Sequence, residues 1–166
     1  FDFPFYGIRY RTICISSNGL MTFHQPDKEY YNSLLELTKK FAIAPAWDNW
    51  VTYEPYDIYI WQNSTHVGIR WYVTAYYDRS IVANFEAILR NDGTIQFNYD
   101  YNNGTISTTV GISNGAGHIL ADDLTSLNYF STIIFDVYRH DVAIQDMSIH
   151  PAQVYAGQTV NINVTA

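Results

Sequence analysis

The chain has 166 residues, and its nine Lys and Arg against sixteen Asp and Glu give a net charge of -7. This acidic balance argues against a nucleic-acid-binding surface, because such surfaces rely on clustered cations. Aromatic residues make up 17% of the chain and charged residues only 15%, which favours an extracellular domain with wide, half-buried sheet faces, and no apolar run is long enough to span a membrane as a helix.

Short runs rich in β-branched and aromatic residues alternate with turn signals, a pattern that is typical of an all-β fold. The predicted strands are 12–16, 20–24, 41–44, 58–62, 66–74, 82–90, 94–99, 108–113 and 130–138. Only 33–40 has a helical pattern, with three leucines followed by Lys39 and Lys40, which suit a helix C-terminus. We therefore predict an antiparallel β-sandwich of the jelly-roll type.

Two hairpins are predicted from turn residues. Asn91-Asp92-Gly93 joins two runs of alternating apolar residues between 82 and 99, and Gly93 is free to adopt a positive φ. A second tight turn is predicted at Asn18-Gly19, because Asn-Gly is a strong hairpin signal.

The end of the chain is predicted to be a separate unit. Two strand-like runs, 142–149 and 159–164, are separated by Pro151 and by Ala156-Gly157, as in the first hairpin of an immunoglobulin-like sandwich. We predict a β-sandwich surface domain over 1–139 and a partial immunoglobulin-like segment over 140–166. Since such a sandwich needs about seven strands, we expect either a longer parent protein or strands that pair with another molecule.

Three sequons indicate N-glycosylation in a secreted protein. They begin at Asn63, Asn103 and Asn163, and each has Thr two positions later. The first two fall in predicted turns, where a glycan has room. The single cysteine, Cys14, cannot form an internal disulfide and is expected to be a buried, inert thiol.

Aromatic side chains provide a candidate sugar-binding platform, because aromatic rings stack on sugar faces. The candidates are Trp50, Tyr53, Tyr56, Trp61, Trp71, Tyr72, Tyr76 and Tyr77. The alternative is that the same rings form cross-strand packing pairs.

A structural calcium ion is the one cofactor considered. Asp48, Asp122 and Asp123 could supply oxygen ligands, although none lies in a D-x-D-x-D-G loop. The alternative is that these acids form caps, turns and a solvated surface.

Catalysis is not expected. Residues 111–115 fit G-x-S-x-G around Ser113, but a helix does not follow and no histidine is tied to the motif. Glu86 lies in an apolar strand, where alternation turns it away from Phe85 and Leu89, and it is expected to face solvent or a second layer. The histidines show no zinc-like pairing.

Five motifs follow one another in a recognisable order. They are FDFPFYG at 1–7, ISSNGLMTF at 15–23, IAPAWDNW at 43–50, FEAILRNDGTIQFNY at 85–99 and VGISNGAG at 110–117. Over 1–138 this series resembles the NIDO-type extracellular domains of large secreted and surface proteins of archaea and bacteria. The tail from Asp141 resembles a CARDB-type adhesion module. The resemblance implies an extracellular, non-catalytic structural or adhesive role, and it carries no catalytic residues over to this chain.

These observations lead to two functional hypotheses. The first is an assembling subunit of a cell-surface filament, sheath or layer, in which FDFPFYG or the tail is donated as a strand to a neighbouring protomer. The second is a monomeric adhesion module that binds glycans or a protein partner on another cell.

Overall fold

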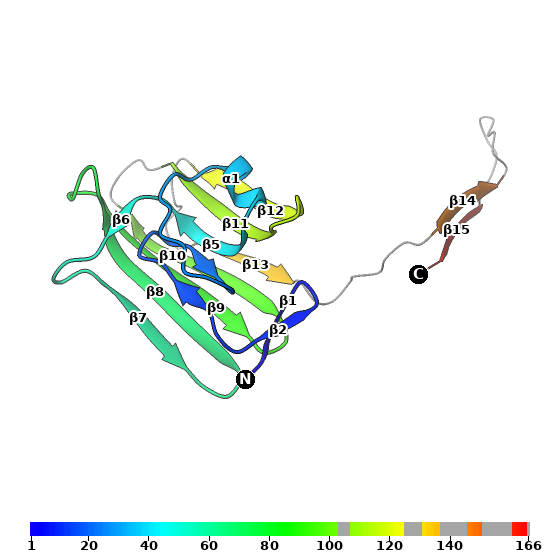
Figure 1. Ribbon diagram of the computed structural model, residues 1–166, viewed down its shortest axis with the longest axis horizontal. Helices are drawn as coiled ribbons and strands as arrows, with labels where there is room; N and C mark the ends of the chain where they lie inside the picture. Colours follow the sequence, from blue (N-terminus) through cyan, green and yellow to red (C-terminus); the bar gives the residue numbers. More distant parts are fainter. Residues whose placement is uncertain (103–106, 125–130, 137–145, 151–160, 166) are drawn as a thin grey trace.

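The computed structural model describes residues 1–102, 107–124, 131–136, 146–150 and 161–165, and it is built almost entirely of strands (Figure 1). The elements are β1 (Phe3–Phe5), β2 (Ile8–Tyr10), β3 (Cys14–Ile15), β4 (Met21–Thr22), α1 (Leu34–Thr38), β5 (Phe41–Trp47), β6 (Trp50–Val51), β7 (Asp57–Gln62), β8 (His66–Ala75), β9 (Val82–Arg90), β10 (Thr94–Asn102), β11 (Thr108–Asn114), β12 (Ile119–Leu124), β13 (Ser131–Asp136), β14 (Asp146–His150) and β15 (Asn161–Thr165).

Two antiparallel sheets form the body of the protein. The six-stranded sheet has the order β13-β10-β9-β8, and both β6 and β7 pair with the far edge of β8. The five-stranded sheet has the order β12-β11-β5-β4-β3. Residues from the facing sides of both sheets share one buried cluster, so the predicted all-β sandwich is confirmed.

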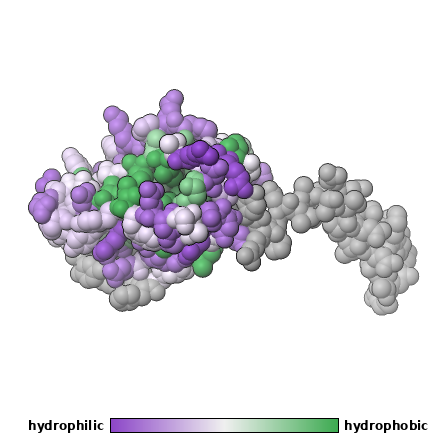
Figure 2. All heavy atoms as spheres, turned by 90° about the horizontal axis from the view of Figure 1, so that it is seen from below, coloured by the Kyte–Doolittle hydropathy of each residue, from purple (hydrophilic) through white to green (hydrophobic). Residues whose placement is uncertain are grey.

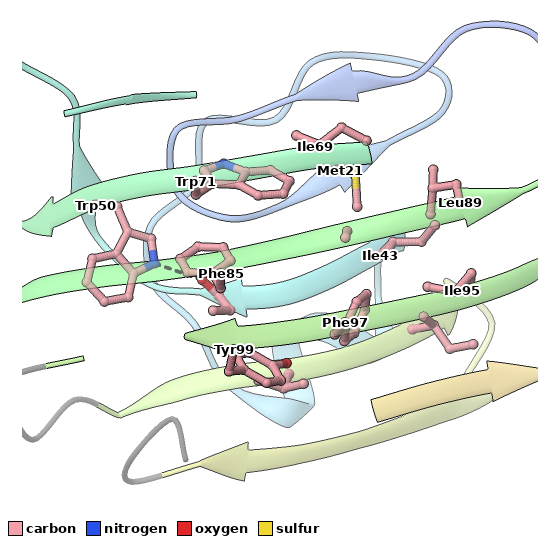
Figure 3. Packing of buried hydrophobic residues seen from close by; sticks show 14 of the residues in the cluster. Met21, Ile43, Trp50, Ile69, Trp71, Phe85, Leu89, Ile95, Phe97 and Tyr99 are labelled. Atoms are coloured by element: carbon pink, nitrogen blue, oxygen red, sulfur yellow. Dashed lines mark hydrogen bonds between the residues drawn. The ribbon is translucent and has the colours of Figure 1, made fainter. Parts of the chain in front are cut away.

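The core between the sheets is rich in aromatic rings (Figure 3). The indole of Trp71 stacks on Phe85 with ring centroids 5.3 Å apart and an interplanar angle of 13°. Its Nε1 donates to the Ser16 carbonyl at 2.9 Å, and the Tyr99 hydroxyl donates to the Pro45 carbonyl at 2.6 Å. Both hydrogen bonds run from the six-stranded sheet to backbone on the side of the five-stranded sheet.

The predicted sugar platform is wrong at two positions. Trp50 and Trp71 are 1% and 0% exposed, and the Trp50 Nε1 donates to the Ala46 carbonyl at 2.8 Å inside the core. Both indoles have their polar atom satisfied by backbone and their rings packed against Phe85. Neither can stack on a ligand at the surface.

The N-terminal hairpin closes one end of the core. β1 and β2 pair with each other, and the rings of Phe3 and Phe5 lie against Phe23 with centroids 6.1 and 4.7 Å away. Phe3 and Phe5 are 5% and 0% exposed, so FDFPFYG fills the core of its own chain.

A second, smaller core lies on the other side of the five-stranded sheet. Leu37 of α1 packs there with Leu20, Ala42, Ala44 and Trp47. The predicted helix over 33–40 is present but shorter, from Leu34 to Thr38, and the Ser33 side chain caps its start by accepting from the Glu36 N–H at 3.1 Å. The helix therefore covers the outer face of the five-stranded sheet (Figure 1).

Every predicted strand has a counterpart, and the described residues contain four further strands. The hairpin of β9 and β10 turns at Gly93 with φ 92°, as expected. β1, β2 and β6 are two or three residues long, too short to show a periodicity, and β12 has adjacent acids where an apolar alternation would be needed.

The two tail strands form a sheet of their own. β14 pairs with β15 in an antiparallel register that sets Met147 opposite Val164 and Ile149 opposite Ile162. The predicted boundary at 139/140 lies outside the described residues, and it stays a prediction, as does the immunoglobulin-like character of the tail.

Candidate ligand-binding face

The outer face of the six-stranded sheet, which faces away from the core, brings polar side chains from four strands into one row. The register pairs Tyr59 of β7 with Arg70 of β8, Arg70 with Glu86 of β9, and Glu86 with Asn98 of β10. Side chains directly opposite one another on neighbouring strands lie on the same face of a sheet. We call this set the polar row.

Hydrogen bonds fix the carboxylate at the centre of the polar row. Glu86 Oε1 accepts from Trp61 Nε1 at 3.1 Å, and Oε2 accepts from Asn98 Nδ2 at 3.0 Å. The other end of the Asn98 amide is also held, because its Oδ1 accepts from Gln96 Nε2 at 2.8 Å and from Thr132 Oγ1 at 3.0 Å. The expectation that Glu86 faces away from the core is confirmed.

A second chain of polar contacts runs beside the first. Arg70 Nε donates to Asn84 Oδ1 at 2.8 Å, and Asn84 Nδ2 donates to Asp100 Oδ2 at 2.7 Å. These residues border an open hollow of about 250 Å³, which is lined by Arg70, Asn84, Phe85, Glu86, Asn98, Tyr99 and Asp100. The hollow therefore presents guanidinium, carboxylate and amide groups in orientations that neighbouring side chains hold.

A glycine allows Trp61 to reach the polar row. Trp61 lies opposite Gly68 of β8, and a Cβ added at Gly68 would lie 2.2 to 2.4 Å from three atoms of the indole. The ring therefore lies over the backbone of β8 and extends to Glu86 on β9. Trp61 remains 42% exposed, so one side of the indole is available to solvent.

Tyrosines gather at the other end of β7. The rings of Tyr53 and Tyr72 lie 5.2 and 4.9 Å from Tyr56, and the Arg79 guanidinium lies 5.1 Å from the ring of Tyr53. Partial desolvation and the neighbouring tyrosines Tyr72 and Tyr53 raise the pKa of Tyr56. The predicted platform is thus divided between this tyrosine cluster and Trp61.

The remaining platform candidates lie in the turn after β8. Tyr76 and Tyr77 are 62% and 61% exposed. The Tyr76 N–H donates to the Asn49 carbonyl at 2.9 Å, which fixes the turn against the segment before β6.

A family model described as NIDO related matches residues 1–154. The chain belongs to the NIDO-related family. The match contains the whole sandwich and continues past the predicted boundary at 139. Neither a curated protein nor a solved structure matches the chain. None of the described helices is long and apolar enough to cross a membrane.

The NIDO-related chain has one described calcium candidate. Asp48 is half-buried between β5 and β6, its Oδ1 accepts from the Asn49 N–H at 2.7 Å, and burial raises its pKa. Among the residues that the structure describes, no three His, Cys, Asp or Glu side chains are grouped as metal ligands. The side chains of Asp122 and Asp123 lie outside the described part, so calcium binding stays a prediction.

One of the three sequons can be placed in full. Asn63 is exposed in the turn between β7 and β8. Asn103 lies outside the described residues, and so does the side chain of Asn163 in β15. The structure therefore gives geometry for the first sequon, and glycosylation at the other two stays a prediction.

The G-x-S-x-G motif has a structural explanation. Ser113 is 0% exposed in β11, and its Oγ accepts from the Gly115 N–H at 3.1 Å. A nucleophile elbow presents its serine at a strand-to-helix turn, whereas this serine lies within a strand and is inaccessible.

Apolar residues also reach the surface near the N-terminal hairpin. A cavity of about 170 Å³ is lined by Phe1, Phe3, Tyr10, Arg11, Thr12, Ile13, Phe23, Gln62, Val67 and Leu89. Seen from below, the molecule shows apolar residues gathered in one area with hydrophilic residues around them (Figure 2).

Proposed function

We propose that this chain is a non-catalytic binding domain of an extracellular, cell-surface protein, and that it binds glycans across the outer face of the six-stranded sheet. The observation that carries the proposal is the polar row, in which Glu86, Asn98 and Arg70 are oriented by hydrogen bonds beside the exposed ring of Trp61.

The chemistry of this face suits a carbohydrate. Sugar hydroxyls both donate and accept hydrogen bonds, and carboxylate, amide and guanidinium groups supply complementary acceptors and donors. The apolar face of a sugar ring packs on an aromatic side chain, as do other apolar ligand surfaces. Tyr59, which is 49% exposed, belongs to the row, and Trp61 borders it on the same strand, β7, so a ligand can contact rings and polar groups together.

A protein partner fits this face less well. The centres of protein interfaces are depleted in charged residues, whereas Arg70, Glu86 and Asp100 border the hollow. A nucleic acid fits less well than a protein, because the chain has a net charge of -7, which has the same sign as the phosphates.

The test is a glycan screen followed by calorimetry on the tightest ligand found. Trp61→Ala removes the ring, and Gly68→Ala keeps every ring but places a Cβ where the indole now lies. Each is expected to weaken binding about tenfold, which corresponds to the upper range of an aromatic contact. Tyr31→Ala is the matched control, since Tyr31 is 69% exposed in the segment before α1. Binding that both variants leave unchanged contradicts the proposal.

A second candidate function is assembly by strand addition. β7 lies at an edge of the six-stranded sheet, and it carries exposed Tyr59, Ile60 and Trp61, at 49%, 59% and 42%. Edge strands of this kind are templates for another strand. Because Phe3 and Phe5 of β1 are buried in the core of the same chain, β1 is not free to be donated, and the tail is the donor that this hypothesis retains. A two-stranded sheet such as β14-β15 is only marginally stable alone.

Assembly by strand addition is tested by a substitution in the edge strand β7. Ile60→Lys adds an edge charge of the kind that natural sheets use to prevent pairing, and it is expected to abolish self-association in mass photometry. Leu120→Lys is the control, because Leu120 is 57% exposed on β12 of the other sheet. Self-association that survives Ile60→Lys excludes β7 as the acceptor strand.

A further inference from the structure

We propose that Asn63 carries an N-linked glycan whose first sugar packs on the exposed side of Trp61. Trp61 lies in β7, Asn63 follows the last residue of that strand, and the side chains of both contact the ring of His66. The sequon and the indole are thereby placed on the same side of the hairpin.

The turn holds the sequon in one arrangement. The Asn63 N–H donates to the His66 carbonyl at 2.9 Å, which leaves Ser64 and Thr65 as a two-residue loop. Asn63 Oδ1 accepts from the Thr65 N–H at 2.8 Å and from the Thr65 hydroxyl at 3.0 Å. The amide oxygen is therefore occupied, and the amide nitrogen is the end of the side chain that lies against His66.

Contacts through His66 connect that nitrogen to the indole. Asn63 Nδ2 lies 3.1 Å from His66 Nε2, and the rings of His66 and Trp61 meet edge to face with centroids 5.0 Å apart. Nδ2 is the atom to which an N-linked sugar is attached. The attachment point of the first sugar is therefore separated from the Trp61 ring by the His66 side chain alone, and that ring lies over Gly68.

The modification uses a lipid-linked oligosaccharide as the sugar donor. Asn63 Nδ2 forms a bond to C1 of the first sugar, and the C1–O bond to the donor phosphate breaks. The phosphate leaves with the bonding electron pair, and the proton lost from the amide passes to the transferase. No oxidant or reductant takes part.

The glycan regulates the face described above, and this part of the inference rests on the proposed function. A sugar on Trp61 covers the ring that an external glycan would use, so the glycosylated chain binds its ligand more weakly than the unmodified chain. The same sugar shields the exposed end of β7 from strand addition.

The test begins with the chain secreted from a eukaryotic host and with peptide mapping of Asn63 by mass spectrometry. The melting temperature, Tm, is then measured for three forms: fully glycosylated, trimmed to one sugar by an endoglycosidase, and fully deglycosylated by an amidase that leaves Asp at 63. Each form is made with Trp61 and with Trp61→Ala, so that the effect of the Asp cancels between the two backgrounds.

We expect the trimmed form to keep the Tm of the glycosylated chain, and full removal to lower it by about 2–4 °C with Trp61 present. With Trp61→Ala, full removal is expected to change Tm only by the effects that both backgrounds share, such as the Asp left at 63. An unmodified Asn63, or the same Tm loss in both backgrounds, overturns the inference. Ligand binding is measured separately: if no form binds a glycan, the proposed function fails while the Tm comparison still decides this inference.

Discussion

At the scale of single residues, hydrogen bonds from buried aromatic side chains tie the two sheets together. Trp71 and Tyr99 come from the six-stranded sheet and donate to backbone carbonyls of Ser16 and Pro45. A buried carbonyl that loses its donor costs about 1–3 kcal/mol, so these contacts contribute to the alignment of the sheets as well as to burial.

We predict that Trp71→Phe lowers the free energy of unfolding by about 1–3 kcal/mol, because the Ser16 carbonyl loses its partner. Trp71→Ala is expected to cost about 3–5 kcal/mol, since it also leaves a cavity. Tyr76→Ala, at an exposed ring, should stay within about 0.5 kcal/mol. Urea unfolding of the three variants measures the loss in the free energy of unfolding for each. An equal loss for Trp71→Phe and Tyr76→Ala would show that the hydrogen bond from Trp71 to the Ser16 carbonyl does not contribute to stability.

Asp48 gives a prediction with a defined sign. Burial raises its pKa above the unfolded value, so its protonated form is favoured by folding. Its contribution to stability is present at low pH and is lost as the pH rises through the folded pKa. The stability of Asp48→Asn relative to the wild type should therefore increase as the pH is raised from 3 to 7. Paired unfolding curves at both pH values check this, and a relative loss over the same range would indicate a bound cation at Asp48.

At the scale of elements, alternation and turn chemistry predict the strands that are long enough to display them. β9 has the bounds that its pattern predicts, and the alternation of Ile69, Trp71 and Val73 already placed an indole among core residues. The platform prediction failed at Trp71 because it weighed ring chemistry above this alternation. Trp50 offered no such signal, because β6 has two residues.

The polar row was only partly predictable. Alternation placed Glu86 on the outer face, but which residues meet across strands depends on the register of β7, β8, β9 and β10. The polar residues at 84, 86, 96, 98 and 100 do alternate with apolar ones. That alternation predicts a polar face, but it does not predict that the Trp61 side chain extends over Gly68.

The turn between β3 and β4 should be sensitive to a single methyl group. Gly19 has φ 69°, and an added Cβ would lie 2.1 Å from the Ala46 carbonyl oxygen. Gly7 has φ 78° and open space around it. We predict that Gly7→Ala costs about 1 kcal/mol for the left-handed backbone alone, and that Gly19→Ala costs clearly more. Equal costs in denaturant unfolding would mean that β5 does not constrain this turn.

At the scale of the whole molecule, the two outer faces differ. The outer face of the five-stranded sheet is covered by α1 and the small core beneath it, whereas the outer face of the six-stranded sheet presents polar and aromatic groups to solvent. This asymmetry supports the proposed binding function, because the outer face of the six-stranded sheet is left open for a ligand while the other sheet is covered.

Removing 141–166 separates the two candidate functions. If the tail donates a strand, mass photometry should show assemblies for the full chain and monomers after the deletion, while glycan binding by the sandwich is unchanged. Monomers in both cases would remove the assembly hypothesis.

The most direct measurement is iodide quenching of tryptophan fluorescence with and without a bound glycan. The chain has four tryptophans, and Trp47, Trp50 and Trp71 are at most 1% exposed, so Trp61 is the one that iodide can reach. We predict that a glycan reduces the quenchable fraction of the deglycosylated chain, and that Trp61→Phe removes that fraction. A glycan that binds tightly and leaves quenching unchanged would contradict binding at the outer face.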